Sequence, residues 1–181
     1  MASELLWTRD GLTRLGFHGW IPFRDLQRAH LPNTQGVYVV TRTGTAAPTF
    51  LERSVGGPHK GRDLTVPVAR LRESWTDDAQ ILYIGKASSL RTRLWAYARQ
   101  GRGHSASHYG GRFLWQLPQS EELVVGWREV VTARPGDVED ALITLYAANF
   151  GRRPFANLNG GRAMSVAFAR AVVGAEFDVT V

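Results

Sequence analysis

The sequence predicts a small α/β protein with a central sheet of about three to five strands flanked by helices. Two observations favour this fold class. Short runs rich in valine, isoleucine, tyrosine and tryptophan, which are typical of core strands, occur at residues 36–42, 80–85 and 123–131. Apolar residues also recur at helical spacing within residues 90–97 and 136–150. Strands and helices therefore alternate along the chain.

The length and composition indicate a single domain. The 181 residues suffice for one unit with its own core, so we expect one domain over residues 1–181. With 44% apolar and 21% charged residues, the chain resembles ordinary soluble proteins, and no apolar run reaches the roughly 18 residues of a membrane helix. Charged residues interrupt the N-terminal apolar positions, unlike a secretory signal. We expect a cytoplasmic protein without a membrane partner.

The chain contains no cysteine. This excludes disulfides, thiolate metal sites and a cysteine nucleophile, and it suits a reducing compartment.

The N-terminal half contains two segments without strong periodicity. Residues 1–35 are broken by prolines and predict an N-terminal arm with a short helix over residues 23–29. Residues 43–79, between the first two core strands, are rich in glycine and proline and are typical of a long ordered insertion or flap. A short helix is expected within it at residues 68–75.

The helix after the second strand carries an unusual arginine. Ser88 or Ser89 is its expected N-cap. Arg93 falls beside Leu90 and Leu94 on the apolar face, whereas charged residues normally occupy the solvent face. The spacing indicates that Arg93 is directed at a site.

The remaining segments are predicted with less regular signals. Residues 100–112 are glycine-rich and read as a loop, and residues 113–117 fit either a strand or a short helix. The helix over residues 136–150 has acidic residues in its first turn and ends at Gly151. The tail, residues 163–181, predicts a helix and a terminal strand.

Positive charge is concentrated in one segment. Residues 79–120 contain no aspartate or glutamate, and their net charge of +6 equals that of the whole chain. Such an excess is typical of a surface that binds phosphates, although a solvated basic helix face is the alternative. The basic residues of the segment are Lys86, Arg91, Arg93, Arg99, Arg102 and Arg112.

Several of these side chains are candidates for contacts with nucleic acid. They are Arg91, Arg99, Arg102 and Arg112, together with His104 and His108 in the glycine-rich loop. Trp75, Trp95 and Trp115 could stack on bases, but we expect at least two of them to pack in the core.

An ordered set of residues resembles the GIY-YIG nuclease family. The set comprises Gly36, Val37 and Tyr38 in the first strand, Tyr83, Ile84 and Gly85 in the second, and then Arg93, Glu139 and Asn157. The segment YIGKASSLRTRLWAY is especially similar to the N-terminal nuclease domain of the nucleotide-excision-repair incision subunit. The resemblance covers about residues 36–157 and leaves residues 158–181 as a C-terminal extension.

The chain departs from the family pattern in two places. Tyr38 and Tyr83 are 45 positions apart, where the family usually has a short hairpin. The gap between Glu139 and Pro154 is also longer than usual.

The resemblance implies the GIY-YIG fold, with a small, mostly antiparallel sheet, and a metal-dependent endonuclease that hydrolyses phosphodiester bonds. Arg93 would hold the charge on the phosphoryl oxygens. Glu139 would bind Mg²⁺ or Mn²⁺, with Asp137 and Asp140 as rival ligands. DNA is favoured over RNA as the substrate.

The resemblance also implies roles for the tyrosines. Tyr38 would act as a general base or orient the attacking water. Because a phenol has an unperturbed pKa near ~10, this role requires nearby cations, and Lys86 and Arg93 are the candidates to lower the pKa. Tyr83 would be catalytic or only positional. Tyr97 would share the phosphate or the water network.

Three further residues would support the site. Gly36 belongs to the first motif, and Gly85 would leave the backbone accessible after the second strand. Asn157 would hold the loop near the site through its side-chain amide.

No second recognition module is apparent. We therefore expect weak sequence specificity or a preference for a DNA structure, with any specificity supplied by residues 43–79, residues 100–112 or an unknown partner. Because one active site cuts one strand, a homodimer is a second candidate partner. A catalytically inactive nucleic-acid-binding or protein-interaction module on the same fold is the alternative. Repair, restriction, mobile-element and toxin contexts remain open, including a defence nuclease with a cognate inhibitor.

Overall fold

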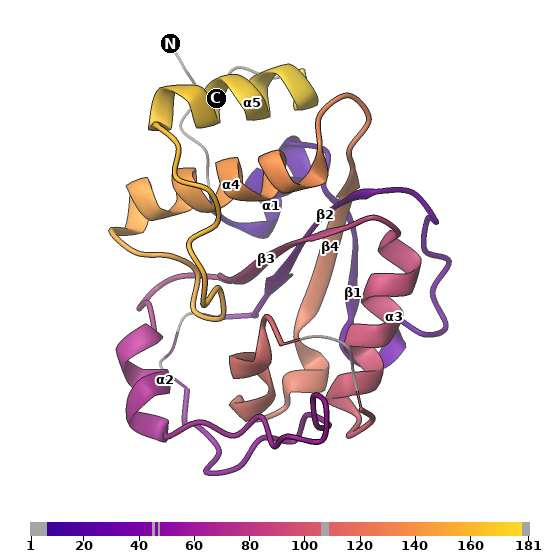
Figure 1. Cartoon of the computed structure of the whole chain (residues 1–181), viewed down its shortest axis with the longest axis vertical. Helices are drawn as coiled ribbons and strands as arrows, with labels where there is room; N and C mark the ends of the chain where they lie inside the picture. The colour runs from indigo at the N-terminus through magenta and orange to yellow at the C-terminus, as the bar shows by residue number, and fades with distance from the viewer. Residues whose placement is uncertain (1–6, 45, 47, 106–108, 179–181) are drawn as a thin grey trace.

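The protein has a four-stranded antiparallel sheet flanked by helices (Figure 1), which confirms the predicted α/β class. The computed structural model describes residues 7–44, 46, 48–105 and 109–178. The strand order is β1-β4-β2-β3, so β2 is central and β3 is an edge strand. The strands are β1 (His18–Pro22), β2 (Gly36–Thr41), β3 (Ile81–Ala87) and β4 (Val124–Glu129).

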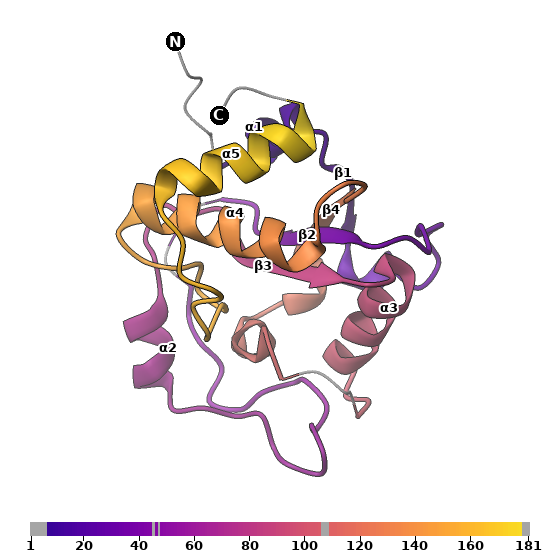
Figure 2. The same ribbon diagram turned by 45° about the horizontal axis from the view of Figure 1, so that its top comes forward.

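Three helices cover one face of the sheet. Figure 2 shows α4 and α5 layered over it, with α1 beside them. Val37 and Val39 of β2 point into this core, where they pack with buried residues of α4 such as Leu142. The helices are α1 (Arg9–Arg14), α4 (Pro135–Phe150) and α5 (Val166–Phe177).

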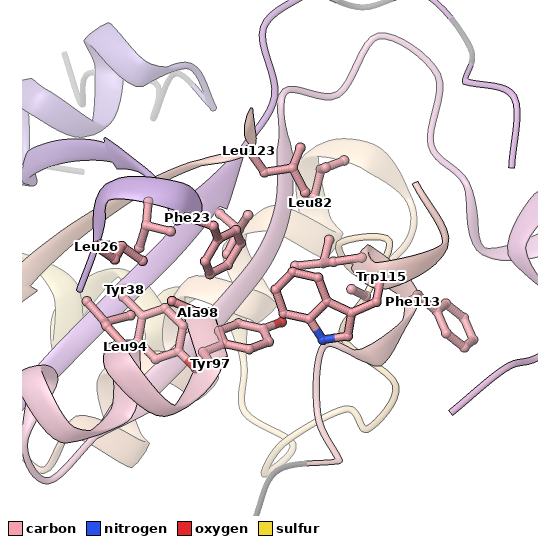
Figure 3. Packing of buried hydrophobic residues seen from close by; sticks show 14 of the residues in the cluster. Phe23, Leu26, Tyr38, Leu82, Leu94, Tyr97, Ala98, Phe113, Trp115 and Leu123 are labelled. Carbon is pink, nitrogen blue, oxygen red and sulfur yellow. The ribbon is translucent and has the colours of Figure 1, made fainter. Parts of the chain in front are cut away.

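The other face carries a second core. Tyr38 and Val40 of β2 point into it because neighbouring residues of a strand face opposite sides. Figure 3 shows Tyr97 beside Trp115 in this core, with ring centroids 5.1 Å apart. The elements on this side are α2 (Val68–Ser74), α3 (Leu90–Gly101) and the 3-10 helices η1 (Phe23–Asp25), η2 (Arg112–Gln116) and η3 (Ser120–Glu122).

The connection between β2 and β3 packs against this second core. The backbone N–H of Val55 donates to the carbonyl of Trp115 at 2.9 Å, and that of Gly57 donates to Gln100 at 2.7 Å. Leu64 and Leu71 are buried. The segment is thus an ordered layer, and α2 forms where a short helix was expected.

Several helix ends lie where the local sequence pattern predicted them. Ser89, one of the two expected N-caps, accepts a hydrogen bond from the N–H of Thr92 at 3.2 Å. Gly151 ends α4 with a left-handed φ of 71°. Of the residues 113–117, which fitted either a strand or a helix, residues 113–116 are helical, because η2 spans Arg112–Gln116.

The N-terminal prediction was wrong in part. Residues 18–22 form β1 and pair with β4, and the helix expected over residues 23–29 is limited to η1. The N–H of Phe23 donates to the carbonyl of Leu123 at 3.0 Å, so a tertiary contact holds the chain here. The strand predicted at the end of the tail falls largely on residues 179–181, outside the described residues.

Within the described part of the chain, every helix is too short or too polar to cross a membrane.

Candidate active site

A cavity of about 560 Å³ lies beside the edge strand β3. Tyr83 and Lys86 of β3 line it, as do Glu139 and Asp140 of α4 and the loop residue Asn157. Residues far apart in sequence therefore line the same cavity.

Three tyrosines cluster beside this cavity. The ring centroids of Tyr38 and Tyr83 are 6.0 Å apart, and that of Tyr97 lies 6.2 Å from Tyr38 and 5.9 Å from Tyr83. Tyr83 lines the cavity, whereas Tyr38 and Tyr97 are only 2% and 1% exposed. The Tyr97 hydroxyl donates to the carbonyl of Gly111 at 3.1 Å. Tyr38 thus lies behind Tyr83.

The protonation of these tyrosines corrects one expectation. Burial, reinforced by the neighbouring Tyr83, raises the pKa of Tyr38 well above its ordinary value, and the positive charge of Arg93 opposes this only in part. Burial also raises the pKa of Tyr83 to about 12. Arg93 lowers the pKa of Tyr38, as expected, but desolvation outweighs this effect, so the net lowering that a general base requires is not found. Both phenols are neutral at pH 7.

Two motif glycines are required by close packing. A Cβ on Gly85 would lie 2.6 Å from Cζ of Tyr38, which faces it across the β2–β3 pair. A Cβ on Gly36 would collide with the backbone carbonyl of Arg128. Gly85 thus makes room for the tyrosine rings, rather than for an approach to the backbone.

Glu139 is a largely buried carboxylate paired with a lysine. Its Oε2 lies 3.1 Å from Nζ of Lys86, and its side chain is 15% exposed. Burial raises the pKa of Glu139; Lys86 and, more weakly, Arg93 counteract this rise, while the charge of Asp140 adds to it. The carboxylate thus lines the cavity, and burial and the nearby cations shift its pKa in opposite directions.

The arrangement can accommodate a hard divalent cation. Glu139 and Asp140 line the same cavity, whereas Asp137 lines a different one, beside α5. Among the described residues there is no group of three or more His, Cys, Asp or Glu able to hold an ion. Mg²⁺ commonly uses one or two carboxylates, with waters and phosphate oxygens completing the shell. Glu139 and Asp140 fit such an ion if Glu139 breaks its ion pair with Lys86 and binds the metal instead.

Arg93 connects α3 to the end of β3. Its Nε donates to the carbonyl of Lys86 at 3.3 Å. Its positive charge lowers the pKa of Tyr38, Tyr83 and Glu139, so the guanidinium lies near all three. This position follows from the α3 face on which Arg93 is placed beside Leu94.

Asn157 closes the edge of β3. Its Oδ1 accepts the N–H of Ile84 at 2.9 Å, and its Nδ2 donates to the carbonyl of the same residue at 2.8 Å. The N–H of Ala156 donates to Leu82 at 2.9 Å. The amide thus replaces a missing neighbouring strand and attaches the loop to the cavity wall.

The other candidate nucleic-acid residues are dispersed. Arg112 lines the cavity, but Arg91 donates to the carbonyl of Leu31 at 3.1 Å, and Arg102 binds Gln27 and the carbonyl of Arg24. Arg99 and His104 are exposed. His108 lies outside the described residues.

The tryptophan expectation was correct. Trp75 and Trp115 are buried, and Trp95 is 37% exposed.

Several residues that line the cavity were not predicted from the sequence. Arg70 comes from α2, and Tyr109, Asn159 and Arg162 come from loops. In the sequence, Arg70 has the pattern of an ordinary exposed arginine on a helix. Its place beside the cavity depends on how the connection between β2 and β3 folds back against the rest of the domain, which no local pattern predicts.

Comparison of the chain with protein families, characterised proteins and solved structures found no match in any of the three. The function is therefore inferred from the residues of the cavity and from the motif resemblance.

Proposed function

We propose that this protein is a metal-dependent endonuclease of the GIY-YIG type that hydrolyses phosphodiester bonds, with DNA as the preferred substrate. One observation carries the proposal: Tyr83, Lys86 and Glu139 line one cavity, and the charge of Arg93 acts on Glu139 and Tyr83. These are the residues to which the motif resemblance assigns catalysis. The GIY-YIG fold is part of the proposal, and the central position of β2 between β3 and β4 is compatible with it.

The charged residues would bind the metal ion and the phosphate oxygens. Glu139 would hold Mg²⁺ or Mn²⁺, which when bound stabilises charge on the phosphoryl oxygens and activates water. Arg93 would place its planar guanidinium against a phosphoryl oxygen. Lys86, released from Glu139, would be free to neutralise a second oxygen or the departing one.

The tyrosines would position water rather than ionise. Tyr83 faces the cavity with a neutral hydroxyl, which can both donate and accept hydrogen bonds. The rings of Tyr38 and Tyr97, which pack against Tyr83, limit the positions that its side chain can take. Tyr38 and Tyr97 would therefore act through the packing of Tyr83.

A cleavage assay tests the proposal. Supercoiled plasmid, linear duplex, branched DNA and structured RNA would be incubated with Mg²⁺, Mn²⁺ or EDTA. We expect metal-dependent nicking by the wild type and losses of about 10²–10³-fold in Arg93→Ala and Glu139→Ala. Arg170→Ala and Glu121→Ala, at exposed positions outside the cavity wall, are the matched controls. Cleavage that persists in EDTA, or in both site variants, would contradict the proposal.

A second candidate is a nucleic-acid-binding module without turnover. The ion pair between Lys86 and Glu139 at 3.1 Å favours it, because the pair occupies the carboxylate that a metal requires. In that case the wild type cuts none of the substrates, while wild type and site variants alike retard DNA in a gel.

A further inference from the structure

Three arginines outside the proposed catalytic set also line the cavity. Two of them, Arg112 and Arg70, lie near each other. Arg112 comes from η2 and Arg70 from α2, within the long connection between β2 and β3. Arg112 is only 8% exposed. Its guanidinium carbon lies 3.9 Å from the ring centroid of Tyr109 and 5.4 Å from that of Phe113. The stacking holds the planar group in place, and the cavity provides its remaining contact with solvent.

Among the described residues, neither guanidinium has an anionic partner. Within residues 7–44, 46, 48–105 and 109–178, the ion pairs involve other side chains, and no acceptor binds Arg112 or Arg70. Burial lowers the pKa of Arg112, Tyr109 opposes the shift, and the charge of Arg70 lowers the pKa further. The two arginines are thus close enough to repel each other. An uncompensated, largely buried cation is costly, and an anion bound beside it removes that cost.

We propose that Arg112 and Arg70 form a phosphate-binding subsite for a second phosphate group of the nucleic-acid strand held in this cavity. The inference rests on the proposed function, because it assumes that the ligand is a nucleic acid. Guanidinium groups suit this task, since each presents a planar fork of N–H donors to two phosphate oxygens. The subsite lies in the cavity that also contains Lys86 and Glu139.

The structure explains how Arg70 is brought to Arg112. Gln116 of η2 is fully buried, and its Oε1 accepts the N–H of Val66 at 2.8 Å. Its Nε2 donates to the carbonyls of Val66 and Leu51, each at 3.0 Å. The side chain therefore ties the connection that carries Arg70 to the helix that carries Arg112. The long connection between β2 and β3 therefore supplies one of the two arginines of the proposed phosphate-binding subsite.

A binding measurement in EDTA tests the subsite without cleavage. The probe is a single-stranded DNA 12-mer with an internal fluorophore, followed by anisotropy at several salt concentrations. Arg70→Gln is compared with Arg72→Gln, an equally exposed arginine on the same helix that does not line the cavity. We expect Arg70→Gln to weaken binding about five- to tenfold and to reduce the salt slope by about 0.7. Arg72→Gln should stay within about twofold of the wild type.

Arg112→Lys provides a second variant at the buried position. It keeps the charge but replaces the planar fork with a single ammonium group, so we expect weaker binding with a nearly unchanged salt slope. A thermal melt establishes that the variant is folded before binding is measured.

Three oligonucleotides distinguish the source of the phosphate: one with a 5′-phosphate, one with a 3′-phosphate and one with neither. An equal effect of Arg70→Gln on all three assigns an internal phosphodiester, whereas an effect confined to one assigns a strand end; both support the subsite. Equal affinities for Arg70→Gln and Arg72→Gln, or no binding by the wild type, overturn it. Absence of plasmid cleavage with a specific Arg70 effect would refute the nuclease proposal alone.

Discussion

At the scale of single residues, Glu139 shows how a functional group can oppose stability. Its carboxylate is largely buried, and burial raises its pKa despite the ion pair with Lys86. A raised pKa in the folded state means that ionisation destabilises the fold. The site thus holds a charge that the protein would be more stable without, as expected where function rather than stability selects the residue.

Replacing this charge should stabilise the protein at neutral pH. We expect Glu139→Gln to raise the melting temperature at pH 7 by about 1–3 °C, measured by circular dichroism. The gain should disappear below the unfolded carboxyl pKa of about 4.3, where the wild-type side chain is protonated in both states. It should grow as the pH rises through the higher folded pKa.

Glu121→Gln, at an exposed position, is the control and should leave the melting temperature unchanged. A lower melting temperature for Glu139→Gln at pH 7 would show that the attraction to Lys86 exceeds the cost of burial.

At the scale of elements, the edge of β3 depends on a loop rather than on a strand. Asn157 binds both backbone groups of Ile84, at 2.9 and 2.8 Å. This side of β3 carries Tyr83 and Lys86 in the cavity wall. The loop after α4 therefore determines both the protection of the sheet edge and the shape of the site.

Asn157→Ala should weaken this edge. We expect the free energy of unfolding to fall by about 1–3 kcal/mol, because two buried backbone groups lose their partners. Urea denaturation measures the change. Asn159→Ala, an exposed asparagine in the same loop, should have no comparable effect, and equal losses in the two variants would argue against a special role for the Asn157 amide.

At the scale of the whole molecule, the C-terminal helix is part of the core. α5 lies on α4, the helix that carries Glu139, as Figure 2 shows. Ala169, Val173 and Phe177 of α5 are buried. The segment that the motif resemblance leaves outside the family core thus supports the helix that positions the carboxylate.

Val173→Asp should therefore destabilise the whole domain. Val173 is fully buried, and an unpaired carboxylate there should cost about 3–5 kcal/mol. Val166→Asp places the same charge at the exposed first turn of α5, where the helix dipole favours it. Thermal melts of both variants make the comparison, and similar melting temperatures would show that α5 is dispensable.

Much of the fold follows from local patterns. The run of β-branched and aromatic residues at Val37–Val40 and the apolar spacing of α4 are signals that act over a few residues. The N-cap at Ser89 and the glycine that ends α4 are others. Such signals depend on backbone preferences and on the alternation of buried positions, so they are readable before the chain is folded. The weakly patterned β1 was missed, because its pairing with β4 selects the strand.

The sequence by itself determined the fold class, the main strands and helices, and the candidate residues Tyr83, Arg93 and Glu139. Only the tertiary structure decided which candidates share a cavity, that Arg70 joins them, and that Tyr38 is a buried, neutral phenol. The reason is physical: a pKa depends on the desolvation and charges that surround a group. Those surroundings are made by segments distant in sequence, so they do not exist until the layers pack.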